Sequence, residues 1–131
     1  MSRGLAWLAD ARIGSGMSEV PQRGEIYWVK LPGHPRDRKA RPALVVSLEV
    51  RNRLANDVMV VPLSTTLRAA PTHVRIEQGE GGVDYVSMAK CEQLTTLEKG
   101  FLLRGPFAGK VRDTTMADIE RAIMRAIGIV V

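Results

Sequence analysis

The amino-acid sequence predicts a mainly β fold, a small twisted β-barrel with one amphipathic α-helix at its C-terminal end. Three short apolar runs rich in β-branched and aromatic residues have the length and composition of strands. They span residues 24–31, 41–48 and 58–67. Near the end of the chain, apolar residues recur at helical spacing, at Met116, Ile119, Ile123 and Ile127. Asp113 or Thr114 can cap this helix, and Gly128 stands where it would end.

The first 20 residues differ from the rest of the chain. Their apolar residues are scattered and too few for a secretory signal, which carries roughly 7 to 15 in a row. We therefore expect residues 1–20 to form a loosely ordered extension and residues 21–131 to form one domain with a single core. The longest apolar runs are well short of the roughly 20 residues that cross a bilayer, so no membrane association is expected.

Between the third run and the helix, the sequence predicts shorter strands separated by turns. Residues 73–77 alternate between apolar and polar, as in a half-buried strand. Residues 85–93 are typical of two short strand pieces around Cys91, and residues 102–111 of a further segment broken by glycine and proline. The prediction is therefore five to seven short strands before the helix.

Charge and cysteine content narrow the function classes. A formal net charge of +5 favours an anionic partner such as nucleic acid or an acidic peptide. The single cysteine, Cys91, excludes an internal disulfide and fits a reducing cytoplasm, and we expect it in the core. No cluster of Cys and His has the spacing of a metal site, so neither a metal nor another cofactor is expected. The ends of the apolar runs gather a guanidinium, hydroxyls and other cations, and such a rim suits a phosphodiester.

Five segments along the chain carry a resemblance to a known family. They read R-G-E-I-Y-W-V at 23–29, R-P-A-L-V-V-S at 41–47, V-V-P-L-S-T at 60–65, P-T-H-V at 71–74 and K-C-E-Q-L-T-T-L at 90–97. In this order they resemble the MazF/PemK family of toxin endoribonucleases, also called mRNA interferases. The resemblance runs from residue 22 through the C-terminal helix.

The resemblance implies an SH3-like barrel, usually a homodimer, that acts as the toxin of a type II toxin–antitoxin system. Members of the family cleave single-stranded RNA without a metal ion, by attack of the ribose 2′-hydroxyl on the adjacent phosphorus. The products are a 2′,3′-cyclic phosphate and a 5′-hydroxyl, and the reaction needs a base, positive charge on the phosphorane and an acid. A cognate antitoxin silences the toxin, and the basic charge of this chain favours an acidic one.

Arg41 and Ser64 are the first two residues expected in the catalytic site. Arg41 matches the active-site arginine of the family, and its guanidinium can stabilise charge on two phosphate oxygens. Ser64 stands where the family commonly has threonine and keeps the hydroxyl that can donate to the phosphate. The alternatives are an ion pair of Arg41 with Asp37 or Glu49, and a turn in which Ser64 satisfies local backbone groups.

The loop of residues 32–40 departs most from the family pattern. Many members carry a glutamate and a glutamine there, whereas this chain has Arg36, Arg38 and Lys39, which we expect to bind RNA phosphates. His34 follows a glycine as a histidine does in the Kid branch of the family, and an imidazole can serve as base or acid near neutral pH. A solvated loop histidine is the alternative.

Lys90 and Glu92 flank Cys91 where the Kid branch has an arginine and an aspartate. On a strand, positions two apart share a face, so both side chains are expected at one catalytic pocket. Their charges match the family, although lysine cannot reproduce a bidentate guanidinium contact. An ordinary cross-strand ion pair is the alternative. His73 is expected to belong to the structure of its strand.

Two further residues are expected to contact RNA, Thr65 beside the catalytic serine and Trp28 as a stacking platform. Two other function classes stay open. The related gyrase poison CcdB has this architecture without the ribonuclease site, and the arginine and hydroxyl described above argue against it. A basic nucleic-acid-binding barrel is the other class, although two Trp, two Tyr and two Phe provide few residues for base stacking.

Overall fold

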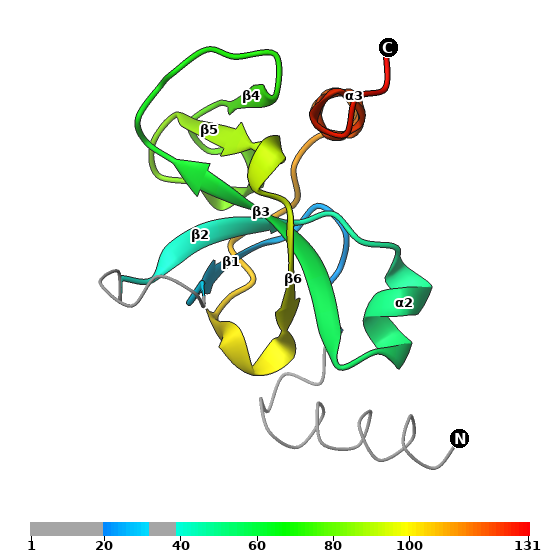
Figure 1. Cartoon of the computed structure of the whole chain (residues 1–131). Helices are drawn as coiled ribbons and strands as arrows, with labels where there is room; N and C mark the ends of the chain where they lie inside the picture. The colour runs from blue at the N-terminus through cyan, green and yellow to red at the C-terminus, as the bar shows by residue number, and fades with distance from the viewer. Residues whose placement is uncertain (1–19, 32–38) are drawn as a thin grey trace.

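The computed structural model of this chain describes residues 20–31 and 39–131 (Figure 1). The predicted extension at residues 1–20 lies outside the described residues except for Val20. None of the helices within the described ranges has the length and hydropathy of a bilayer-spanning helix.

The described residues form seven strands and two α-helices. The strands are β1 (Ile26–Val29), β2 (Arg41–Val45), β3 (Asp57–Ser64), β4 (His73–Ile76), β5 (Ser87–Lys90), β6 (Thr95–Glu98) and β7 (Leu102–Arg104). The α-helices are α2 (Glu49–Leu54) and α3 (Asp113–Ala126), and short 3₁₀ turns are η1 (Glu80–Gly82), η2 (Cys91–Gln93) and η3 (Lys99–Phe101). This confirms the predicted mainly β class with a C-terminal helix.

All strand pairs are antiparallel, in the order β4-β5-β3-β2-β1-β7. β3 is the longest strand and pairs with β6 along its first half and with β5 at its end. Among the described strands, β4 and β7 end the order and do not pair with each other. The barrel of the prediction is therefore a twisted, open sheet, which bends at β3 so that β4 and β5 stand apart from β1 and β2 (Figure 1).

Side chains of the central strands alternate between two buried clusters, as the period of two along a strand requires. Ile26, Leu44 and Val61 belong to the cluster that α3 covers. Tyr27 and Ala43 belong to the other cluster, which residues of β3 and β6 complete. Because both faces of β1 to β3 are buried, these strands read as continuous apolar runs in the sequence.

The C-terminal helix α3 begins and ends close to where the sequence predicts. Its buried face consists of Thr115, Met116, Ile119 and Ala122. Gly128, at a φ of 90°, follows the helix, and its N–H donates to the carbonyl of Arg125 at 3.0 Å. The expected cap from Asp113 or Thr114 is wrong, because the N-cap position is Arg112 and no side chain caps the helix there.

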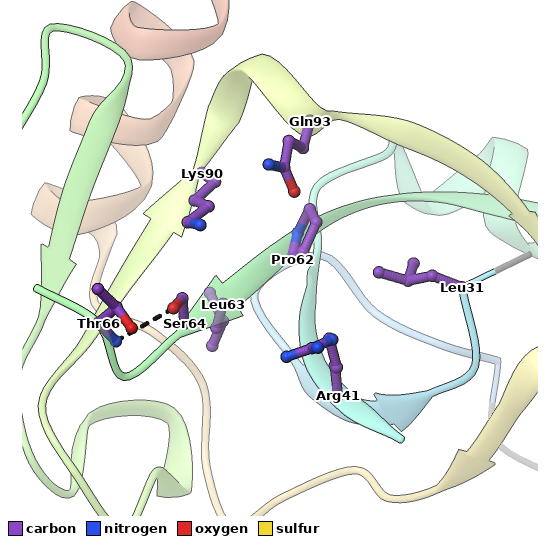
Figure 2. A pocket seen from close by; sticks show the side chains of 8 residues that line it. All are labelled: Leu31, Arg41, Pro62, Leu63, Ser64, Thr66, Lys90 and Gln93. Atoms are coloured by element: carbon purple, nitrogen blue, oxygen red, sulfur yellow. Dashed lines mark hydrogen bonds between the residues drawn. The ribbon is translucent and has the colours of Figure 1, made fainter. Parts of the chain in front are cut away.

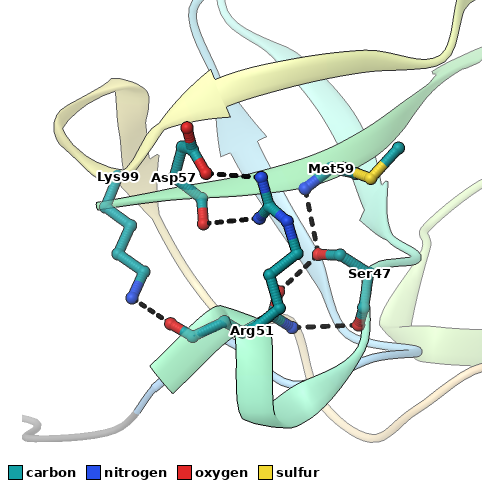
Figure 3. A network of polar contacts seen from close by, with 6 residues as sticks. Ser47, Arg51, Asp57, Met59 and Lys99 are labelled. Atoms are coloured by element: carbon teal, nitrogen blue, oxygen red, sulfur yellow. Dashed lines mark hydrogen bonds and ion pairs between the residues drawn. The ribbon is translucent and has the colours of Figure 1, made fainter. Parts of the chain in front are cut away.

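Helix α2 was not predicted, and a buried polar network holds it against the sheet (Figure 3). Asn52 is fully buried, and its Nδ2 donates to the carbonyls of Pro21 and Ser47, each at 3.1 Å. The Ser47 hydroxyl contacts the Asn52 Oδ1 and accepts from the N–H of Met59 at 2.9 Å. On the same helix, Arg51 donates to the carbonyl and to the carboxylate of Asp57.

The segment 85–93 differs from its prediction. Only Ser87–Lys90 is a strand, and a 3₁₀ turn follows at Cys91–Gln93. Cys91 is 1% exposed and lies in the cluster under α3, as expected. Likewise, the segment 102–111 contains one short strand that ends before Gly105.

Candidate active site

The register of β2 and β3 brings Arg41 and Ser64 to one face of the sheet. Ala43 pairs with Pro62, and paired residues on antiparallel strands point to the same side. Arg41 lies two residues before Ala43 and Ser64 two residues after Pro62, so both side chains point to that side. Strand pairing thus brings together two residues that are 23 positions apart in the sequence.

Lys90 reaches the same place from β5. Leu63 pairs with Ala89, so Lys90, the next residue of an antiparallel partner, stands opposite Pro62. Lys90 is the last residue of its strand and is partly buried. Figure 2 shows the side chains of Lys90, Ser64 and Arg41 around one shared space.

These side chains line a cavity of about 350 Å³, within the usual range for small-molecule sites. The described residues that line it are Leu31, Arg41, Pro62, Leu63, Ser64, Thr66, Lys90 and Gln93. They include two cations and no carboxylate, so the cavity favours an anionic group.

The hydroxyl of Ser64 has one defined contact. Its Oγ accepts a hydrogen bond from the N–H of Thr66 at 3.1 Å (Figure 2). A hydroxyl that accepts in this way can still donate its own hydrogen. Ser64 can therefore donate to an oxygen placed between Arg41 and Lys90.

Glu92 does not line the cavity with Lys90. The strand ends at Lys90 and η2 begins with the next residue, so the expected alternation along a strand stops there. The Glu92 carboxylate accepts from Thr72 Oγ1 at 2.8 Å and lies 3.1 Å from His73 Nε2. Burial raises the pKa of Glu92, but hydrogen bonds from Thr72, from the backbone and from His73 outweigh it, and the net pKa is lowered.

The remaining predicted site residues either lie outside the described residues or do not line the cavity. His34, Arg36 and Arg38 lie outside the described residues, and Lys39, two residues before Arg41, is exposed. Thr65 is exposed in the loop after β3 and does not line the cavity.

Trp28 lies on the opposite face of the sheet from the cavity. It pairs with Pro42, whereas its neighbour Val29 pairs with Arg41. Its ring lies 5.6 Å from that of Phe107 and 5.6 Å from the guanidinium carbon of Arg104. This geometry fits a half-buried packing position with a cation–π contact.

Five lining residues were not identified from the sequence, namely Leu31, Pro62, Leu63, Thr66 and Gln93. Gln93 lies within the 90–97 segment that carries the family resemblance, which was a usable signal. Thr66 directly follows the predicted hydroxyl pair, but a hydroxyl in a turn commonly satisfies local backbone groups.

The site offers no obvious place for a metal ion. Within residues 20–31 and 39–131, no group of three or more His, Cys, Asp or Glu side chains is arranged to hold one. Burial, and then the nearby Glu92, raises the pKa of the Cys91 thiol to about 12, so this cysteine is neither a ready nucleophile nor a ready ligand. The polar side chains that line the cavity are those of Arg41, Lys90, Gln93, Ser64 and Thr66.

Comparisons with known proteins show which proteins this chain is similar to. Endoribonuclease MazF4 of Mycobacterium tuberculosis is 36% identical over 110 residues, which cover 84% of this chain and 95% of that protein. Endoribonuclease MazF1 of Mycobacterium bovis matches to the same extent.

Solved structures give the same result. An endoribonuclease from a mycobacterial species, in complex with its cognate antitoxin, superposes with a TM-score of 0.70 at 32% identity and covers 85% of this chain and 98% of its own. The M. tuberculosis toxin MazF-mt6 superposes with a TM-score of 0.69 at 25% identity, over 82% of this chain and 99% of its own. Residues 22–127 match the family described as PemK-like, MazF-like toxins of type II toxin–antitoxin systems, and the chain belongs to that family.

Proposed function

We propose that this chain is the toxin of a type II toxin–antitoxin system and an endoribonuclease that cleaves single-stranded mRNA without a metal ion. The observation that carries the proposal is the cavity in which Arg41, Ser64 and Lys90 meet, in a chain similar to MazF endoribonucleases over most of its length. Two cations and a hydroxyl around one space are suited to a phosphodiester.

The cut forms a bond from the 2′-oxygen to phosphorus and breaks the bond from phosphorus to the 5′-oxygen. Arg41 stabilises the charge that develops on the phosphorane oxygens, and Ser64 donates a hydrogen bond to the same group. A base accepts the 2′-hydroxyl proton and an acid supplies a proton to the leaving oxygen. We assign these two proton transfers to His34 and Lys90. The Glu92 carboxylate acts on the site indirectly, through its contacts with Thr72 and His73.

RNA also binds the basic segment that precedes β2 in the sequence. Arg36, Arg38 and Lys39 bind phosphates on either side of the cut, and Thr65 contacts the strand beside Ser64. Duplex RNA resists cleavage, because in-line attack requires a nucleotide that can leave its stack. An mRNA substrate and a single buried thiol fit a protein of the cytoplasm. The toxin domain spans residues 21–131.

The partners follow from charge and exposed apolar surface. The net charge of +5 suits an acidic antitoxin, and a related mycobacterial endoribonuclease has been solved with its cognate antitoxin. Large apolar side chains that are at least 45% exposed include Leu48, Val50, Leu54, Leu67 and Leu103, which gives the chain a reason to form a homodimer. Sedimentation then gives twice the 14.4 kDa chain mass, and a stable monomer contradicts the dimer.

The proposal is tested by incubating the purified protein with a long defined RNA in EDTA. Primer extension then maps the cuts, and mass spectrometry of the fragments identifies their ends. We expect cuts in single-stranded regions that leave 2′,3′-cyclic phosphates and 5′-hydroxyls. Intact RNA together with inhibition of gyrase supports the CcdB-like alternative, and cleavage that requires added magnesium contradicts the proposed chemistry.

A further inference from the structure

The imidazole of His73 bridges two segments that line the cavity. Its side chain is 7% exposed. Nδ1 lies 2.6 Å from the carbonyl oxygen of Arg68, and Nε2 lies 3.1 Å from Oε2 of Glu92. Arg68 belongs to the loop after β3, and Glu92 belongs to η2 after β5. One ring thus contacts both segments.

On one side, a chain of hydrogen bonds runs from this ring to the proposed catalytic hydroxyl. Nδ1 of His73 contacts the carbonyl of Arg68, whose N–H donates to the carbonyl of Thr66 at 3.1 Å. The N–H of Thr66 in turn donates to Ser64 Oγ at 3.1 Å. The position of His73 is therefore linked to the direction of the Ser64 hydroxyl.

On the other side, the ring holds the segment that carries the lysine of the cavity. Glu92 lies between Lys90 and Gln93, which both line the cavity. His73 is also paired with Lys90 in the register of β4 and β5. Thr72 reinforces the connection, because its Oγ1 donates to Glu92 at 2.8 Å and its carbonyl accepts from the backbone N–H of Cys91 at 2.9 Å.

Both groups that face the ring nitrogens are acceptors. A carbonyl oxygen cannot donate and a carboxylate cannot donate, so only a ring with hydrogens on both nitrogens bonds to both at once. The Glu92 carboxylate of η2 contacts the ring, Lys90 of β5 is paired with His73 in the strand register, and Arg125 of α3 donates to the carbonyl of Pro71, two residues before His73. Loss of one ring proton removes one of the two bonds.

We propose that His73 is a positioning residue that ties the Ser64–Thr66 side of the cavity to the Lys90–Gln93 side. The ring touches no reacting atom. It fixes the separation of the hydroxyl and the ammonium group that act on the phosphate. This inference rests on the proposed endoribonuclease function for its kinetic consequence.

The first test removes the two hydrogen bonds of the His73 ring one at a time. Asparagine keeps an N–H near the position of Nδ1, and glutamine keeps one near the position of Nε2, so each variant retains one of the two bonds. We expect His73→Asn and His73→Gln each to lower kcat for single-stranded RNA by about 10- to 100-fold, the scale of a small misplacement of catalytic groups. KM should change by less than about threefold, because the phosphate-binding cations remain.

Arg75→Gln is the matched control. Arg75 lies on the same strand, is exposed and pairs with Glu77, so the control should cleave like the wild type. Circular dichroism and thermal unfolding show whether each variant is folded. Folded His73 variants with an unchanged kcat overturn the proposal, as does an equal loss in Arg75→Gln.

The second test needs no cleavage and compares the NMR spectra of the folded wild type, His73→Asn, His73→Gln and Arg75→Gln. His73→Asn loses the contact with Glu92, so the amides of Lys90 and Gln93 should shift. His73→Gln loses the contact with the Arg68 carbonyl, so the amides of Thr66 and Arg68 should shift. Wild-type amide shifts on the side whose contact is lost, or equal shifts in Arg75→Gln, overturn the proposal. If the wild type cleaves no RNA, the proposed function fails, and this comparison still decides whether His73 holds the two segments.

Discussion

Replacing Asn52 by alanine tests how α2 is held at the far end of β2, the strand that carries Arg41. Asn52 is fully buried, and its amide donates to the carbonyls of Pro21 and Ser47 at 3.1 Å. The substitution removes both donors and leaves a void where the amide was. Both carbonyls lose the Asn52 amide as a donor. Water has no direct access to replace it, because Asn52 is 0% exposed.

The magnitude follows from counting the groups that lose a partner. A buried polar group left unsatisfied costs about 1–3 kcal/mol, and three groups are affected here: the carbonyls of Pro21 and Ser47, and the Ser47 hydroxyl, which loses Asn52 Oδ1. Because partial relaxation offsets some of this loss, we expect the free energy of unfolding to fall by about 2–4 kcal/mol. Urea denaturation measures this difference in the free energy of unfolding, provided that both proteins have the same m-value.

Arg53→Ala is the matched control for this prediction. Arg53 is the next residue of α2 and is exposed, so its loss should change the free energy of unfolding by no more than about 0.5 kcal/mol. A loss below about 1 kcal/mol for Asn52→Ala, or one equal to that of Arg53→Ala, would refute the reasoning.

Three further predictions concern titration, thiol reactivity and the catalytic hydroxyl. Burial lowers the pKa of Lys99 from 10.5 to about 8, so between these pH values the unfolded chain binds more protons, and the free energy of unfolding should rise with pH. Urea denaturation between these pH values should show a smaller rise in the free energy of unfolding for Lys99→Met than for the wild type. Parallel pH dependences in the two proteins would contradict the prediction. The Cys91 thiol, 1% exposed and with its pKa raised to about 12, should react with a thiol reagent only in denaturant, and rapid labelling of native protein counts against its burial. Ser64→Ala should slow RNA cleavage by about 10- to 100-fold, the value of a hydrogen bond to a charged group, whereas Ser64→Thr should keep or raise the rate. Equal rates in single-turnover assays of all three forms would remove Ser64 from the mechanism.

The fold was predictable where a local pattern reports burial. The apolar runs of β1 to β3 and the helical spacing of α3 reflect side chains that face a core, and these elements lie where expected. Helix α2 has six residues, and Asn52 is the one that is buried and holds the helix against distant parts of the chain. Such a contact spans distant parts of the chain and leaves no periodic pattern in the sequence.

The site was predictable in part for the same reason. Arg41, Ser64 and Lys90 each stand at the end of a recognisable strand, and strand register brings them together. The position of Glu92 was not predictable, because the sequence does not indicate that the strand gives way to η2 after Lys90. The contacts of His73 were not predicted, because the Arg68 carbonyl and the Glu92 carboxylate that it touches belong to other segments.

The most direct test of the proposed function is the rate at which Arg41→Ala cleaves a defined single-stranded RNA in EDTA. We expect the rate to fall by about 100-fold or more, because a charge donor to the transition state is lost. Arg53→Ala removes the same charge from the exposed surface of α2 and should cleave like the wild type. A folded Arg41→Ala protein that cleaves at the wild-type rate would contradict the assignment of this cavity as the active site.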